Sequence, residues 1–416
     1  MTLVLVTLPR LPLGNDDDSS WSAVMDYAHQ KGLQFGTEIA FSYGPLGFLI
    51  TPYYSPSSPW LRFGTDLFLT LMVTAGYSLL AWRMPRWWRV AALALFALFA
   101  SNADPRSELL LDLGLLSWSL LCLLDLRPGE SPTVRANHPE LNPLGSAIAL
   151  TAFAILAIFC ALAKMTLLFP AAFGLAAIGA CSLLQGRRKQ GVGLMMGTAA
   201  GFVLTWLCLG QNLSHLGPYF LNGIRLSAAY DGTMWADPYP GLKWAALVML
   251  ALVVGAVALC FGAAPQERRE ATAKWSGVMA GAWLCGFLFV IWKHGFVRAG
   301  RDHVEVFFGF VPSLALALEA WPLQRRSRRL WVRGLALTCC LVAVFALRWL
   351  FAGNLAAVVT RPFRLAWTHT GNLAAPLTYQ HQLKDLQQAE RAANQLPHFS
   401  SQIGRSRVDV FGCNQA

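Results

Sequence analysis

Acidic residues near the start of the chain are the first candidates for chemistry. Asp16, Asp17 and Asp18 form a consecutive triplet, and Glu38 follows them before the first long apolar run. A carboxylate can act as a general base or bind a divalent metal ion, and the triplet suits either role. The alternative is a solvated triplet that only stabilises the N-terminal end of a following helix. The residue types leave both interpretations open.

A second set of charged residues interrupts otherwise apolar segments. The set consists of Asp66, Glu108, Asp112, Lys164 and Glu305. Charged side chains are costly inside a membrane, so they indicate a functional site by default. Near a helix end they can alternatively reach the interface or pair with a neighbour. Because all five fall toward one side of the membrane in the topology below, we expect a polar cavity that opens outward.

The composition identifies the environment in which these residues work. Of the 416 residues, 55% are hydrophobic and only 13% are charged, and the mean hydropathy is +0.45. An average soluble domain has about 25% charged residues. A chain this long with so few charges could not cover its surface in water. The sequence therefore predicts an all-α, polytopic membrane protein and argues against a soluble or disordered chain.

Ten apolar runs are candidate transmembrane helices. They cover residues 60–82, 87–101, 108–124, 144–163, 166–185, 193–211, 241–262, 275–292, 304–320 and 330–351. The apolar stub Met1–Leu8 is too short to cross alone and is interpreted as part of a first helix, with the recorded start inside it. The expected number of spans is therefore about 10–11.

The basic residues fall on alternate loops between these runs. They are Arg83, Arg86, Arg89, Arg127, Arg135, Arg187, Arg188, Lys189, Arg268, Arg269, Lys274, Arg325, Arg326, Arg328, Arg329 and Arg333. Loops rich in Lys and Arg are typically cytoplasmic. The outer side then receives loops 10–59, 102–107, 212–240 and 293–303. The net charge of +11 is thus mainly a topology signal, which removes the reason to expect a nucleic-acid partner.

The first outer loop contains a predicted surface helix and a turn. Ser19 or Ser20 is a plausible helix N-cap, and Gly32 can end the helix. Trp21, Val24, Met25 and Ala28 recur at helical spacing between them, which is typical of an amphipathic helix lying on the membrane. The segment Phe41–Phe48 follows, and Gly44-Pro45 inside it is a strong turn signal.

The chain resembles the GT-C superfamily of polyprenyl-phosphate-sugar-dependent glycosyltransferases in four segments and in the order of these segments along the chain. That superfamily includes protein O-mannosyltransferases and the aminoarabinose transferases of lipid A, and the resemblance is closest to uncharacterised bacterial inner-membrane members. The segments are Asp18–Trp21, Phe41–Phe48, Ala163–Thr166, and Lys293–Arg298 with Asp302 and His303. The resemblance implies a GT-C-like membrane domain with a juxtamembrane helix, in the bacterial inner membrane, with its site facing the periplasm or exterior.

The resemblance also implies which acidic residues are catalytic. In the family, an acidic residue of the first outer loop acts as general base or helps to hold a divalent metal such as Mg²⁺ or Mn²⁺. Asp18 is the first match by position, followed by Asp17, Asp16 and Glu38. The second outer loop supplies Asp104 as a further match. The chain departs from the family's Asp-Glu pair by carrying an Asp triplet, which leaves the catalytic position and the metal open.

The expected substrate-binding residues are cationic, aromatic or polar. Transfer from a lipid phosphate needs cations to stabilise the departing phosphate, while His side chains can act as general acids or metal ligands. Aromatic rings with nearby carboxylates suit a sugar. The residues are Lys164, Lys293, His294, Arg298, Arg301, Asp302, His303, Tyr43, Tyr230 and Trp235. The alternatives are a basic loop that touches lipid headgroups and an aromatic belt at the interface.

Two other functions remain open. A transporter or lipid flippase often shows inverted repeats and helices broken near the midplane. The sequence shows no such repeat, and its charges lie toward the outer face. A non-catalytic envelope assembly protein would keep the fold and bind lipid without transfer. The leading prediction is a glycosyltransferase that moves a sugar from a polyprenyl-phosphate donor to an envelope acceptor.

The chain divides into a membrane domain, 1–351, and an outer segment, 352–416. The second segment is polar and lacks a predicted span. Residues 381–396 favour an exposed helix with Leu383 and Leu386 on one face, and residues 407–411 alternate as in a strand. A lone strand at the end leads us to expect that the outer segment is truncated.

Asp18→Asn and Glu38→Gln test the catalytic assignment. Each substitution removes a potential base and retains the side-chain size, so sugar transfer to the acceptor should fall. Full transfer by both variants, measured with the donor in membranes, would remove these carboxylates from the catalytic mechanism.

Overall fold

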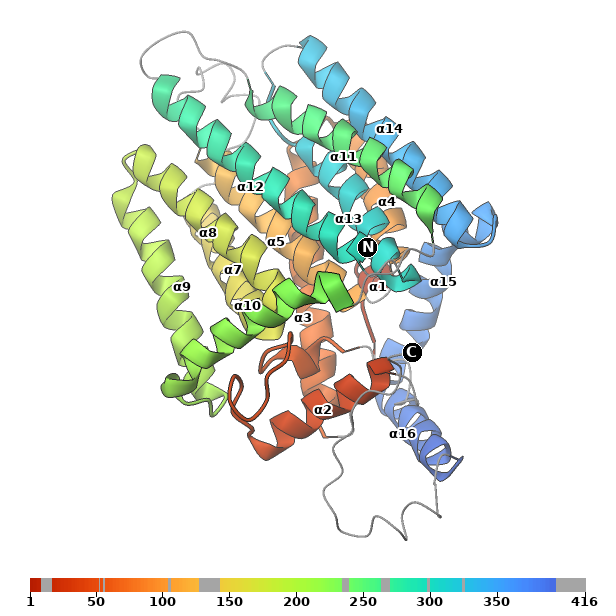
Figure 1. Cartoon of the computed structure of the whole chain (residues 1–416). Helices are drawn as coiled ribbons and strands as arrows, with labels where there is room; N and C mark the ends of the chain where they lie inside the picture. Colours follow the sequence, from red (N-terminus) through yellow and green to blue (C-terminus); the bar gives the residue numbers. More distant parts are fainter. Residues whose placement is uncertain are drawn as a thin grey trace.

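The chain folds as a bundle of long helices. The computed structural model describes residues 1–8, 17–51, 53–54, 57–103, 106–126, 143–233, 239–262, 270–297, 300–323 and 326–393. Within these ranges the regular structure is helical, with only isolated β-bridges besides (Figure 1). The expected all-α, polytopic membrane class is confirmed.

Each predicted apolar run corresponds to a helix of the bundle. The helices are α3 (Pro59–Trp82), α4 (Arg86–Ser101), α5 (Arg106–Asp125), α7 (Pro143–Ala163), α8 (Met165–Leu184), α9 (Arg188–Cys208), α11 (Pro240–Phe261), α12 (Glu270–Val297), α13 (Arg301–Leu318) and α14 (Arg326–Leu350). The first helix, α1 (Thr2–Leu5), is a single turn that contacts α15, α4 and α3.

Eight described helices are long and apolar enough to cross a membrane, fewer than the runs counted from the sequence. The two bundle helices outside this set are α4 and α13. With 16 residues, α4 is about 24 Å long, whereas a bilayer core is about 30 Å thick. α13 carries Arg301, Asp302 and Glu305 in its first two turns. The two helices pack against each other, with α13 almost fully buried and α4 exposed on one side at Trp87 and Val90.

The centre of the bundle is α5. All of its candidate span is buried, against 22% for the peripheral α9. A helix that is apolar on every side is stable inside a protein core or in lipid, and α5 is of the first kind, because its span is enclosed by protein. α3, α7, α8 and α13 pack around α5 (Figure 1). A charged residue on α5 therefore has no water to solvate it and needs a partner on a neighbouring segment.

The predicted surface helix is α2 (Asp17–Lys31), which starts earlier than the expected Ser19 or Ser20. Met25 and Ala28 are buried as expected, but Val24 is exposed. Gly32 ends the helix as predicted, with a positive φ of 62°, while Leu33 N donates to Ala28 O and Gly32 N to His29 O. His29 stacks on Phe48, and burial lowers its pKa despite the nearby Asp26.

The break between α7 and α8 is held by the predicted turn segment. Gly44 N donates to Ala163 O at 3.0 Å, Leu46 N donates to Leu162 O at 2.9 Å, and Met165 N donates to Ser42 O at 2.8 Å. These bonds satisfy backbone groups that the helix ends leave unpaired. A Cβ at position 44 would overlap Leu162 O and the Tyr219 hydroxyl, so only glycine fits this close approach.

Three further helices of the described residues lie toward the same end of the bundle as α2 (Figure 1). α10 (Leu216–Thr233) falls in the long loop 212–240, and α15 (Leu355–Ala374) precedes α16 (Pro376–Ala393) in the C-terminal segment (Figure 1). α16 starts earlier than predicted, and of the two leucines expected to share one face only Leu383 is buried, while Leu386 is 55% exposed. The predicted strand 407–411 lies outside the described residues. The sequence does not predict α15, because polar residues divide its apolar residues into short groups.

Gly44→Ala tests the tight contact between the turn and the helix break. The added methyl should cost about 1–3 kcal/mol, the usual range for overpacking. Thermal unfolding of the purified protein in detergent measures this loss as a lower Tm.

Gly193→Ala is the matched control, because a Cβ there meets nothing within 4 Å. It should leave the unfolding free energy unchanged or raise it by up to about 1 kcal/mol, because alanine is favoured over glycine inside the helix α9. Equal Tm values for the two variants would contradict the close approach at Gly44.

Candidate functional site

Glu108, a buried carboxylate in the first turn of α5, is surrounded by polar side chains from other segments. Glu108 is only 4% exposed. Lys164 Nζ lies 2.7 Å from Oε2 and 2.8 Å from Oε1, and the Tyr43 hydroxyl donates to Oε1 at 2.6 Å. His294 Nε2 lies 3.4 Å from Oε2. We call Tyr43, Glu108, Lys164 and His294 the Glu108 cluster, which joins four segments far apart in sequence.

Lys164 reaches this carboxylate because of the helix break. It lies between α7 and α8 with extended backbone angles, φ −153° and ψ 132°, and forms an antiparallel β-bridge with Tyr43. The same backbone pairing that stabilises the break thus places the Lys164 and Tyr43 side chains beside each other. The Lys164 ammonium also lies 4.7 Å from the centroid of the Tyr43 ring, within range of a cation–π contact.

Aromatic residues cover the Glu108 cluster on the side of α2. The ring of Trp21 stacks on Tyr43 with centroids 4.4 Å apart and planes at 20°. Phe41 lies near both rings, at 6.2 Å from Trp21 and 5.7 Å from Tyr43. An apolar cover strengthens the electrostatic interactions beneath it, because it keeps water away from the ion pair.

A row of polar side chains leads from Glu108 toward the surface. The rings of His294 on α12 and His303 on α13 meet edge to face at 5.1 Å, and His303 Nδ1 lies 2.8 Å from Asp302 Oδ2. The exposed side-chain fractions rise along the row, from 5% at Glu108 through 15% and 21% at the histidines to 42% at Asp302. This row is therefore a polar connection from the buried carboxylate to the surface.

Asp112 lies one turn deeper on α5 than Glu108. It is 1% exposed, and neither carboxylate oxygen has a hydrogen-bond partner. A buried ionised carboxylate without a partner is strongly unfavourable. Asp112 therefore adds a further buried polar group to the site, one helical turn below the ion pair.

The other charges expected in a shared outer cavity are paired elsewhere. Asp66 accepts a hydrogen bond from Thr7 at 2.8 Å and lies 4.0 Å from Arg62. Glu305 lies 2.7 Å from Arg301 and 3.9 Å from Arg361. Of the five charges, the structure brings together Glu108, Lys164 and Asp112.

The predicted catalytic acids are distributed as follows. Asp17 and Asp18 form the start of α2, with their side chains outside the described part, and position 18 lies one helical turn before Trp21. Asp16 and Asp104 lie outside the described residues. Glu38 is exposed, and its carboxylate accepts a hydrogen bond from Gln34 N at 2.7 Å, which closes a local turn.

The predicted substrate-binding residues are only partly brought together. Tyr43, Lys164 and His294 belong to the Glu108 cluster, and His303 and Asp302 adjoin it. Lys293 is half-buried next to His294, and Arg301 pairs with Glu305. Arg298, Trp235 and the side chain of Tyr230 lie outside the described residues.

Two participants were absent from the predicted site. Glu108 was recognised as an intramembrane charge, but its central place depends on partners more than 50 residues away along the chain. Trp21 belongs to the apolar spacing of the predicted surface helix and to the Asp18–Trp21 segment of the resemblance, but not to the predicted site residues. The available signal for Glu108 was a carboxylate in the first turn of a strongly apolar run.

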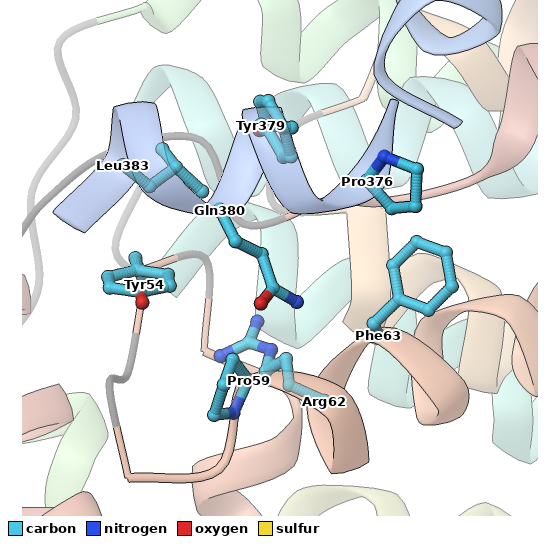
Figure 2. Close-up of a pocket in the computed structure, with 8 residues that line it drawn as sticks. All are labelled: Tyr54, Pro59, Arg62, Phe63, Pro376, Tyr379, Gln380 and Leu383. Carbon is cyan, nitrogen blue, oxygen red and sulfur yellow. The ribbon is translucent and has the colours of Figure 1, made fainter. Parts of the chain in front are cut away.

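A small pocket lies apart from the Glu108 cluster, between the start of α3 and α16. Figure 2 shows its lining residues: Tyr54, Pro59, Arg62, Phe63, Pro376, Tyr379, Gln380 and Leu383. The Gln380 side chain is directed toward the Arg62 guanidinium. Arg62 is buried and donates to Phe48 O, Thr51 Oγ1 and Tyr53 O. These bonds tie the first outer loop to α3.

A metal ion would need several acidic, His or Cys side chains to converge on one point. Among the described residues, no group of three or more His, Cys, Asp or Glu side chains is arranged to hold a metal. Asp16, Asp104 and the side chains of Asp17 and Asp18 lie outside this set of residues.

Lys164→Met and Glu108→Gln test the buried ion pair. Lys164→Met leaves a buried carboxylate without its main counter-charge, which should lower the free energy of unfolding by about 3–5 kcal/mol. The double variant Glu108→Gln/Lys164→Met should be more stable than Lys164→Met alone, because both charges are gone. Thermal or denaturant unfolding in detergent provides the comparison.

Arg187→Met is the matched control at the opposite end of the bundle. Arg187 lies 3.3 Å from Asp125, and its side chain is 43% exposed. Breaking such a surface pair should cost at most about 1 kcal/mol. An additive double variant at positions 108 and 164 would show that the two charges are not coupled.

Comparisons with protein-family models, with curated proteins and with solved structures give no match for this chain. The site is therefore defined by its own geometry: a buried Lys–Glu pair near one end of the helix bundle, covered by aromatic rings and flanked by histidines.

Proposed function

We propose that the protein is a membrane glycosyltransferase that moves a sugar from a polyprenyl-phosphate donor to an acceptor of the cell envelope. The observation that carries the proposal is the Glu108 cluster, where a cation is held at the outer end of an apolar bundle beneath an aromatic cover. In this proposal the bundle resides in a bacterial inner membrane and the site faces the periplasm or exterior.

The location of Lys164 suits a lipid phosphate. A polyprenyl chain extends into the bilayer, so its phosphate sits at the headgroup boundary, near the outer helix ends. Lys164 has three N–H donors and directs two toward Glu108, which leaves one for a phosphate oxygen. Lys293, the neighbour of His294 at the end of α12, adds a second cation on the same side.

In the proposed reaction, the oxygen of the acceptor hydroxyl attacks the anomeric carbon of the sugar. The bond from that carbon to the phosphate oxygen breaks, and polyprenyl phosphate leaves with the bonding electron pair. The hydroxyl proton passes to a carboxylate base. Lys164 stabilises the negative charge that develops on the phosphate, a role for which a fixed cation in a water-poor site is effective.

Glu108 positions Lys164 in this scheme and does not act as the base. Its carboxylate already accepts short contacts from Lys164 and Tyr43 and lies near His294, which stabilises its ionised form. Asp18 is the better candidate for the base. Position 18 lies in the first turn of α2, one turn before Trp21, whose ring stacks on Tyr43.

Tyr43→Phe tests the proposed site with a minimal change. It removes the hydroxyl that donates to Glu108 but keeps the ring under Trp21. Transfer of sugar from a polyprenyl-phosphate donor should fall by about 10-fold or more, the value of one hydrogen bond to a charged group. The assay follows radiolabelled sugar into the acceptor fraction of membranes.

Tyr219→Phe is the matched control. The Tyr219 hydroxyl donates to Ala161 O at 2.8 Å, outside the Glu108 cluster. Its loss should reduce thermal stability and leave the specific transfer rate of the folded protein near that of the native chain. Equal transfer rates for Tyr43→Phe and the native protein would contradict the proposal, as would equal losses in the two variants.

A further inference from the structure

The unexpected helix α15 presents three different faces. Val358, Arg361, Pro362 and His369 are buried against the bundle. Asn102 Nδ2 donates to Val358 O at 3.1 Å, and His369 Nδ1 lies 2.9 Å from Leu3 O. α15 is therefore firmly packed on one side, against α1, α4 and α14.

A second face of α15 is apolar and exposed. Leu355, Val359, Phe363 and Trp367 are four residues apart, and their exposed fractions are 45%, 46%, 74% and 84%. Residues at this spacing form a continuous ridge on a helix. We call these residues the α15 ridge. A ridge of large apolar side chains on a firmly packed helix is unfavourable in water and indicates a covering partner.

The third face of α15 is polar. Thr360, Arg364 and Thr368 are exposed and follow the ridge residues by one position each. The polar row therefore runs beside the ridge. A helix with one face on its own protein, one apolar face and one polar face is suited to the boundary between lipid and water.

The lipid-facing surface of α14 continues into the α15 ridge. α14 is a candidate membrane span, and its exposed side includes Leu341, Phe345 and Trp349 at the same four-residue spacing. Only the short turn from Phe351 to Asn354 separates the two helices. Arg348 and Arg364 are exposed near the two rows, where they can meet lipid phosphates.

We propose that α15 is a membrane-surface helix whose ridge is buried in the outer leaflet of the bilayer. The occupant is the lipid itself, because the ridge extends a surface that lipid already covers on α14. An ion pair also connects α15 to the surroundings of the candidate site. Arg361 on α15 lies 3.9 Å from Glu305, which pairs with Arg301 at the start of α13, next to Asp302 and His303.

Spin labels on the purified full chain in phospholipid vesicles test this proposal. Labels are attached at Phe363→Cys on the ridge and at Thr368→Cys on the polar row, after replacement of the nine native cysteines. Phe345→Cys on α14 provides the lipid-facing standard. Collision rates are measured with oxygen, which concentrates in lipid, and with a water-soluble nickel chelate.

The ratio of oxygen to nickel collisions at position 363 should approach the ratio at 345 and exceed that at 368. A ratio at 363 equal to that at 368 would place the ridge in water and overturn the proposal. An immobilised label that neither reagent reaches would indicate a protein partner or a second copy, and would also overturn it. Trp367→Cys repeats the measurement if the 363 variant does not fold.

Discussion

A charge inside an apolar helix bundle must have a partner, and the ion pair between Lys164 and Glu108 is the partnership on which the site depends. Glu108 projects from α5, the helix that is buried on every side. Lys164 reaches it only because α7 and α8 are interrupted by one extended residue. That interruption is stabilised by backbone hydrogen bonds from Gly44, Leu46 and Met165. The same backbone hydrogen bonds that fold the first loop against the helix break therefore also position the buried ion pair.

This arrangement also determines which side chains cover and flank the ion pair. The pairing that holds the helix break places Tyr43 against Glu108 and Lys164, and Tyr43 in turn supports Trp21 on α2. On the other side, His294 and His303 lead to the surface at Asp302. A second ion network, formed by Glu305 with Arg301 and Arg361, links the start of α13 to α15. The proposed site thus lies where the first loop, the α7–α8 break and the α12–α13 turn converge.

The sequence predicts the helices better than it predicts their contacts. Apolar length is a local property, so each predicted run corresponds to a helix, and the turn at Gly44 and the end of α2 at Gly32 were also anticipated. The sequence does not predict α15, because its apolar residues form a ridge and not a continuous run. The partners of Glu108 could not be identified, because they come from segments 56 and 65 residues away for Lys164 and Tyr43. Nor could residue types alone show that Glu38 is engaged with Gln34 in a local turn.

Binding of polyprenyl phosphate without its sugar is the most direct measurement of the central claim, that the Glu108 cluster holds the lipid phosphate. The native protein and the charge-free variant Glu108→Gln/Lys164→Met are compared in detergent, where the variant is expected to fold. The native protein should bind saturably, and the variant should bind about 10-fold more weakly or worse, because a charged phosphate contact is worth about 1.5–3 kcal/mol. Equal affinities, or no saturable binding by the native protein, would contradict the account.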